Sequence, residues 1–538
     1  MSRILLNRRS FLHLTASAAA LTAMPGLGWA QGETPVKGGR LIVAGDSEPA
    51  NLNPAIVASN GVFFVASKIV EPLAEQSYDG KDGLSPRLAT AWEGSADGLT
   101  ATFKLREGVT WHDGKPFTSA DVAFSALEVW KKLQNLGRVV FKNLESVETP
   151  DDHTAVFKFS QPTPFQLIRN ALPVVTSVVP KHLYEGTDIA KNPANQALVG
   201  TGPFKFGEHK PGEYYLLKRN EAYWQKDQPL LDEIVYQILP DRSSAGNALE
   251  AEQIQLAAFS AVPLADLARI SKVPGLKVYA NGYEGLTYQL IVEINHRRKE
   301  LADPKVRQAL AHAIDRDFVV KTIFLGYAKP STGPVPAYDK AFYEPDVAAH
   351  AFDPAKAEAL LDEAGYKRGA DGNRFTLKLL PAPFFNETKQ FGDYLRQALA
   401  KVGIDAQVVS NDTPAHLKAV YTDHDFDITV ATPVYRSDPA ISTTILFESG
   451  LPAGVPFSNQ YGYANADVDK LIKDAASTVD SDKRADLYKQ LQKVVAADLP
   501  LINVAEFSFI TVARDTVQNV SDNPRWAVSN WSNVWLKG

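Results

Sequence analysis

The sequence contains no cysteine. This absence excludes disulfide bonds, thiolate metal sites, cysteine nucleophiles and a lipid-modified cysteine behind an export signal. A chain of 538 residues does not depend on disulfides, because it can bury a large apolar core. The length also exceeds that of one ordinary domain, so we expect two or three.

A strong charge of either sign is also lacking. The net charge is −6, and the apolar and charged fractions, 45 % and 22 %, are those of a globular protein. Proteins that bind nucleic acid or anionic lipid need a basic surplus, so neither class is expected. Behind the N-terminal segment, no apolar run is long enough to cross a bilayer.

The motifs of common enzymes are missing as well. The chain has no P-loop, no GxSxG and no HExxH. The segment TDHDFD (422–427) places His424 between acids, but it leads directly into a predicted strand and fits no metal-site spacing. We therefore predict a protein that is not an enzyme, with no catalytic residues, no metal and no cofactor. The sequence leaves one alternative open, a catalytic pair of carboxylates that come from distant segments.

The N-terminus predicts export. Arg8 and Arg9 lie in NRRSFL, a mildly apolar stretch follows, and Gly28-Trp29-Ala30 has small residues where signal peptidase needs them. NRRSFL looks like a twin-arginine signal, and the alternative is an ordinary secretory signal with two arginines. Residues 1–30 are thus predicted to be removed near Ala30, which leaves a soluble protein in the periplasm.

The remaining sequence changes character near residue 286. Residues 37–285 are rich in alternating strands and Asp-Gly turns, with RLIVAG (40–45) as the first strand. Residues 286–505 contain helices that begin at Asp303-Pro304 and Asp353-Pro354 and alternate with strands, as in a parallel α/β unit. The residues after 505 are again predicted to form strands. We predict an α/β protein whose chain crosses between two lobes more than once.

Six segments, taken in order, resemble the peptide/nickel-type (family 5, cluster C) solute-binding proteins of bacterial ABC importers. They cover essentially the whole mature chain and are SEPANLNPA (47–55), LSPRLATAWEGSADGLTATFKLREGVTWHDGKPFTSADVAFS (84–125), VGTGPFKFGEHKPGEYYLLKRNEAYW (199–224), INHRRKELADPKVRQALAHAIDR (294–316), DPAKAEALLDEAGY (353–366) and NQYGYANADVDKLI (459–472).

The resemblance implies a type II periplasmic binding protein fold of two lobes that close on a ligand by hinge motion. It also implies an extra subdomain on lobe I, a monomeric state and docking of the loaded form on a membrane permease. The sequence map assigns 37–60, 200–285 and 506–538 to lobe I, 61–199 to the extra subdomain and 286–505 to lobe II.

The loop TPVYRSDPA (432–440) follows the predicted strand FDITVA and is the main candidate for ligand binding. In peptide binders of the family, an acid three residues before an Asp-Pro pair holds the ammonium of the peptide. Here that position is Tyr435, followed by Arg436, and an ammonium left unpaired would cost about 3–5 kcal/mol. The arginine that dipeptide binders carry for the peptide carboxylate is also missing, from PAPFFNE (381–387).

Each candidate ligand residue has an alternative interpretation. Tyr435 can stack on a ring or pack within the loop, and Arg436 can clamp a carboxylate or phosphate or pair with Asp438. Asp438 itself is expected mainly to shape the turn before Pro439. Ser59 and Asn60 are also candidate ligand residues, and their alternative is an ordinary turn. Phe384 and Phe385 are the last candidates, and their alternative is core filling.

Two ligand classes follow. The nominal prediction is a peptide or peptide-like solute, because peptides are common ligands in the family. The missing charge anchors favour the alternative, a non-peptide solute such as an oligosaccharide, an opine or another small organic acid or amide. A sensory or chaperone-like role is not separated from transport by any residue.

Overall fold

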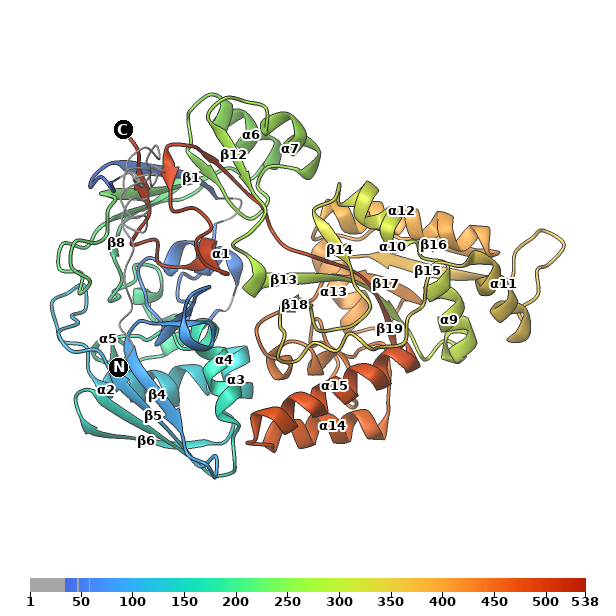
Figure 1. Cartoon of the computed structure of the whole chain (residues 1–538), viewed down its shortest axis with the longest axis horizontal. Helices are drawn as coiled ribbons and strands as arrows, with labels where there is room; N and C mark the ends of the chain where they lie inside the picture. The colour runs from blue at the N-terminus through green and yellow to red at the C-terminus, as the bar shows by residue number, and fades with distance from the viewer. Residues whose placement is uncertain (1–33, 46–47, 58) are drawn as a thin grey trace, which may run out of the picture. The chain divides into compact units, whose positions relative to one another are not determined.

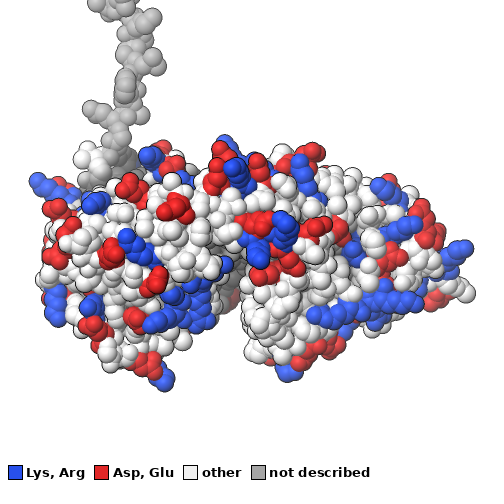
Figure 2. All heavy atoms as spheres, turned by 90° about the horizontal axis from the view of Figure 1, so that it is seen from below, with Lys and Arg blue, Asp and Glu red and all other residues white. Residues whose placement is uncertain are grey.

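The computed structural model describes residues 34–45, 48–57 and 59–538. The predicted export segment, residues 1–30, lies outside these residues. Lys37 to Gly538 form one compact unit. Within the described part, no helix combines the length and the apolar character needed to cross a membrane. Acidic and basic side chains are interspersed over the face shown in Figure 2.

One seven-stranded mixed sheet forms the core of the first lobe (Figure 1). The predicted strand RLIVAG is its central β1, which pairs in parallel with β10 and β11. Alternate residues of β1, such as Leu41 and Val43, are fully buried, as the period of two predicts. In order across the sheet the strands are β12 (Leu276–Tyr279), β20 (Thr511–Arg514), β11 (Leu256–Ala257), β1 (Arg40–Gly45), β10 (Glu233–Ile238), β9 (Tyr214–Arg219) and β8 (Phe204–Lys210).

A four-stranded antiparallel sheet forms a second core from residues 89–159. Its apolar face packs Phe103 against Phe157 and carries the buried Trp130 of the adjoining helical segment. Thr118 caps helix α2 with a capping box completed by Asp121. The elements are β4 (Ala89–Gly94), β5 (Thr100–Leu105), β7 (Thr154–Phe159), β6 (Leu144–Asp151), α2 (Ser119–Phe124), α3 (Asn135–Val140), α4 (Phe165–Val175) and α5 (Lys181–Tyr184).

The second lobe is built on another mixed sheet. Its strands β15 and β16 are parallel and are connected by α12, as the predicted strand–helix–strand unit requires. The strand order is β14 (Ala328–Pro330), β19 (Leu501–Phe507), β13 (Thr287–Ile294), β17 (Ile428–Ala431), β15 (Phe375–Pro381) and β16 (Ile404–Val408), and β18 (Val434–Tyr435) pairs with β13.

Helices of the second lobe begin where the sequence predicted. Asp303 and Asp353 are N-caps with proline at the first helical position, and Asp353 accepts a hydrogen bond from the backbone of Lys356. Helices α14 and α15 lie side by side (Figure 1). The larger helices are α9 (Pro304–His312), α11 (Pro354–Glu363), α12 (Asn386–Lys401), α13 (Thr413–Tyr421), α14 (Ala466–Ser477) and α15 (Ser481–Asp498).

The chain passes between the two large sheets at β12 to β13 and again at β19 to β20. Smaller elements complete the first lobe: α1 (Asn60–Ala66), α6 (Arg242–Glu250), α7 (Leu264–Ile270), β2 (Ala74–Gln76), β3 (Leu84–Pro86), β21 (Val517–Gln518) and β22 (Trp535–Leu536). The lobe limits drawn from the sequence stay a prediction.

Candidate functional site

The predicted loop 432–440 of the second lobe contacts side chains of the first lobe. Gln76 Nε2 at the end of β2 donates a hydrogen bond of 2.5 Å to Ser437 Oγ. Asn170 Nδ2 of α4 lies 3.0 Å from Asp438 Oδ2. These contacts place the loop at the junction of the lobes, where the sequence predicted the ligand.

Asp438 has an internal partner. Its carboxylate is fully buried and accepts two hydrogen bonds from Arg484 of α15, at 2.7 and 2.9 Å, and Arg484 is also fully buried. Asp438 Oδ1 also caps the following turn at Ala440 N, 3.0 Å away. Asp438 therefore shapes the turn, and its oxygens are engaged with protein groups instead of a ligand. The alternative given for Arg436, a pair with Asp438, is not formed, because Arg484 occupies that carboxylate.

Tyr435 also points into the protein. It lies in the short strand β18, which pairs with β13 at Thr287, and its side chain is 2 % exposed. Its hydroxyl donates to Asp339 Oδ2 at 2.6 Å, and its ring packs beside Tyr338. Burial raises the pKa of Asp339 to about 6, and the nearby Asp438 adds to the rise. The ring face that the predicted stacking on a ligand requires is thus packed against the protein.

Arg436 differs from its neighbours in the loop. It is partly buried, and it donates no hydrogen bond to any residue that the structure describes and forms no ion pair there. Burial lowers the pKa of its guanidinium, and the phenol of Tyr288 opposes this effect. A cation desolvated without a carboxylate partner is costly unless a ligand supplies the counter-charge.

A second arginine at this site, Arg525, comes from the first lobe. It is 4 % exposed, its Nη1 donates to the Pro173 carbonyl at 3.1 Å, and its Nε has no partner. The Phe63 ring lies 5.7 Å from the guanidinium. Burial, together with repulsion from Arg436, lowers the pKa of Arg525 to about 10.

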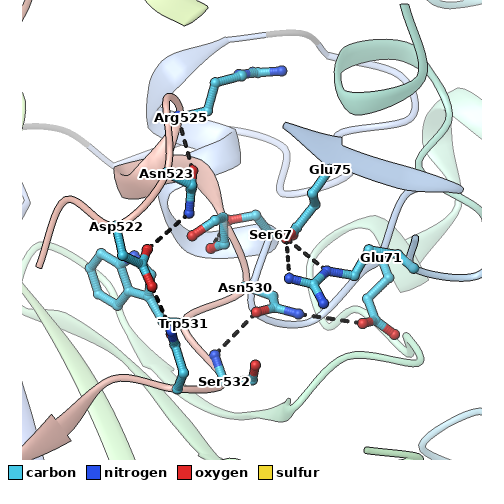
Figure 3. A network of polar contacts seen from close by, with 12 residues as sticks. Ser67, Glu71, Glu75, Asp522, Asn523, Arg525, Asn530, Trp531 and Ser532 are labelled. Atoms are coloured by element: carbon cyan, nitrogen blue, oxygen red, sulfur yellow. Dashed lines mark hydrogen bonds and ion pairs between the residues drawn. The ribbon is translucent and has the colours of Figure 1, made fainter. Parts of the chain in front are cut away.

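A polar network fixes the tail segment that carries Arg525 (Figure 3). The Arg525 backbone N–H donates to Asn523 Oδ1 at 2.9 Å, and Asn530 Nδ2 lies 3.5 Å from Glu71 Oε1. Buried Lys68 donates to the Ala527 carbonyl at 2.7 Å. Figure 3 shows the Arg525 side chain extending away from this network. The network therefore fixes the backbone at Arg525, while the guanidinium of Arg525 points away from the network.

Gln76, Tyr338 and Gly285 complete the cluster. Gln76 Oε1 is buried without a hydrogen-bond partner. Burial raises the pKa of Tyr338 to about 12, and the neighbouring Ser437 and Gln76 oppose this rise. A Cβ at Gly285 would lie 1.9 Å from Gln76 Oε1 and 2.6 Å from Arg525 Cγ. Glycine is required at 285 because these two side chains lie directly against its backbone.

The four remaining predicted residues separate into two groups. Asn60 Nδ2 donates to the Tyr288 hydroxyl at 3.0 Å, and the Phe385 ring centroid lies 5.5 Å from that of Tyr288. The structure thus brings Asn60 and Phe385 toward Arg436 through Tyr288. Ser59 is exposed and caps α1 by accepting from Val62 N at 3.3 Å.

Phe384 packs away from this cluster. Its ring centroid lies 5.9 Å from that of His416 and 5.7 Å from that of Phe457, both in the second lobe. The core-filling alternative describes Phe384 better than the ligand role does. Among the described residues, no three His, Cys, Asp or Glu side chains are grouped as a metal site requires.

Sequence reasoning missed Gln76, Gly285, Tyr288, Tyr338 and Arg525. They come from segments far apart in the chain, and no local motif marks them. The one available signal was Arg525 itself, a single cation in the tryptophan-rich segment NPRWAVSNW (523–531).

The fold and this interlobe site define the class of protein. Two sheets crossed twice by the chain, with unpartnered polar groups at their junction, are typical of a binding protein that encloses a solute. The family model for bacterial extracellular solute-binding proteins, family 5, matches residues 83–454. The chain belongs to this family, as the six sequence segments predicted.

Individual relatives agree with this assignment. The chain is 28 % identical to the dipeptide-binding protein of Escherichia coli (strain K12), over 97 % of this chain and 98 % of that protein. Among solved structures, the ABC transporter substrate-binding protein CtaP of Listeria monocytogenes superposes with a TM-score of 0.81 at 26 % identity, covering 93 % of this chain and 100 % of CtaP. AgaA of A. tumefacien R10, solved with agropinic acid, has a TM-score of 0.73 at 26 % identity, with 93 % and 99 % covered.

The glycine at 285 provides a first prediction. Gly285→Ala is expected to weaken solute binding by about tenfold or more, because the new methyl group displaces Gln76 and Arg525. Calorimetric titration of the variant with the solute released from wild-type protein measures this loss. Gly333→Ala is the matched control, since its Cβ would meet nothing closer than Gln492 Oε1 at 3.9 Å. Equal affinity of the 285 variant would place the solute elsewhere.

Proposed function

We propose that this protein captures a small peptide-like solute between its two lobes in the periplasm and delivers it to the permease of an ABC importer. The observation that carries the proposal is the interlobe cluster, in which the described part of the chain provides no partner for Gln76 Oε1 or Arg525 Nε and no counter-ion for Arg436. Membership of a solute-binding family supports it, and so does the dipeptide ligand in the name of the Escherichia coli relative.

The proposal includes the path to the periplasm and the mode of action. Export uses the twin-arginine-type segment, the mature protein begins near Gln31 and acts as a monomer, and the permease is met only by docking. The protein performs no catalysis of its own, and the lobe limits follow the sequence map.

A second candidate is a non-peptide solute with an acid group. Tyr435 replaces the acid expected to hold the ammonium of a peptide, and its hydroxyl is already bound to Asp339. A relative of equal fold, AgaA, was solved with agropinic acid.

Native mass spectrometry of the protein, purified without added solute, tests the proposal. We expect a bound species that disappears on mild unfolding. A mixture of short peptides would support the first candidate, and a single non-peptide mass the second. Failure to retain a solute, together with failure to bind any peptide or organic acid supplied at millimolar concentration, would refute capture.

A further inference from the structure

Two arginines, one from each lobe, lie at the junction, and neither forms an ion pair with a carboxylate of the described residues. Arg436 comes from the loop after β17, and Arg525 comes from the C-terminal tail. Gln76 connects the two: its Nε2 donates to Ser437 Oγ, next to Arg436, and its Oε1 lies with Arg525 Cγ against the backbone of Gly285. Repulsion from Arg436 also contributes to the lowered pKa of Arg525. Glu75 is an acid that also acts on Arg525, but it already forms a 2.7 Å ion pair with Arg87.

The groups around the two arginines do not neutralise them either. Tyr288 and Tyr338 face them with phenols, which stay protonated at neutral pH. Asp438, the nearest carboxylate in sequence, is saturated by Arg484 and Asn170. The site therefore holds two desolvated cations that repel each other in the absence of a solute.

We infer that an anionic group of the solute, a carboxylate or a phosphate, binds between Arg436 and Arg525 and joins the two lobes through its charge. Guanidinium groups suit this role because their N–H donors match the geometry of such oxygens. The inference rests on the proposed function and names the chemistry of its ligand. The inference excludes a ligand that places an ammonium group between Arg436 and Arg525.

The aromatic residues beside the cations indicate what the rest of the solute resembles. The Tyr288 ring packs within 5.1 to 5.7 Å of the rings of Phe385, Phe507 and Phe509. These three phenylalanines also line a cavity together with Leu264, Phe324 and Tyr327. Polar residues, among them Asn386, Glu387 and Ser508, also line this cavity, so we expect the organic anion to carry an apolar or aromatic part together with polar groups.

Matched acid and amide pairs test the inference. The probes are phenylacetate against phenylacetamide, N-acetyl-leucine against its amide, and the dipeptide Ala-Phe against its C-terminal amide, together with the solute released from the purified protein. We expect the released solute to carry an acid group and the acids to bind at least tenfold more tightly than the amides, with affinity that falls as salt rises. A neutral or cationic released solute, equal binding of acids and amides, or no binding of any acid would overturn the inference.

Substitution of one of the two arginines gives a further test. Arg436→Gln is expected to weaken binding of the acid by tenfold or more, while Arg396→Gln, on the exposed face of α12, leaves it unchanged. Because the substitution removes repulsion, the melting temperature of the ligand-free Arg436→Gln protein should equal or exceed that of wild type. A lower melting temperature together with unchanged affinity would mean that Arg436 is structural, and would overturn the inference.

The two proposals fail in different ways. Tight binding of a neutral solute would leave solute capture standing and would refute only the anion site. A folded wild-type protein that binds nothing would refute both.

Discussion

The Asp438→Asn variant is expected to lose roughly 3 to 5 kcal/mol of unfolding free energy, because Arg484 would remain buried without its counter-ion. Both side chains are 0 % exposed, so water cannot replace the lost charge. The substitution keeps an oxygen for Ala440 N, but it replaces the other oxygen, which accepts from Arg484 and Asn170, by an NH2 donor, and this adds to the loss. Urea unfolding followed by tryptophan fluorescence measures the loss.

A surface pair provides the control for Asp438. Lys470 and Asp474 lie 2.5 Å apart on α14, but their side chains are 72 % and 40 % exposed. Asp474→Asn should change the unfolding free energy by less than about 1 kcal/mol. The double variant Asp438→Asn, Arg484→Met should recover part of the loss, since it removes the unpaired cation. A loss below about 1 kcal/mol for Asp438→Asn would show that Arg484 finds another partner.

The second large effect concerns Glu293, near the C-terminal end of β13. Its side chain is 1 % exposed, Oε1 has no partner, and burial raises its pKa to about 8. The titratable groups acting with it are the phenols of Tyr421 and Tyr461. The folded pKa lies above the unfolded value near 4.5, so the folded state binds the extra proton between these values. Stability contributed by this proton is complete below about pH 4.5 and is lost as the pH rises to about 8.

Glu293→Gln should therefore match wild type near pH 4.5 and exceed it progressively toward pH 8. The difference at pH 8 is expected to be on the order of 4 kcal/mol, because the folded and unfolded pKa values are about 8 and 4.5 and each pKa unit corresponds to about 1.4 kcal/mol. Urea unfolding at several pH values measures this difference. The exposed Glu145→Gln serves as control and should show no such trend. A difference that stays constant with pH would mean that Glu293 is ionised in the folded protein.

Local sequence signals predicted most of the elements correctly. Asp303-Pro304, Asp353-Pro354 and Thr118 begin helices because capping depends only on residues within one turn. The loop 432–440 follows β17, as its position after the predicted strand required, and Ser437 in it accepts a hydrogen bond from Gln76; its role in ligand binding stays a prediction. The partner of Asp438 was not predicted, since Arg484 is 46 residues away and belongs to a helix with no local tie to the loop.

The sequence by itself determined the family, the mixed α/β class and the absence of disulfides, because these depend on composition, local capping and ordered motifs. Tertiary structure decided which side chains are free to meet a solute. Tyr435 and Asp438 were turned inward by Asp339 and Arg484, whereas Arg436 was left without a partner and was joined by Arg525 from the distant tail. The physical reason is that a charge or hydroxyl is available to a ligand only when no protein group satisfies it. Whether it is satisfied depends on neighbours that only the folded chain brings together.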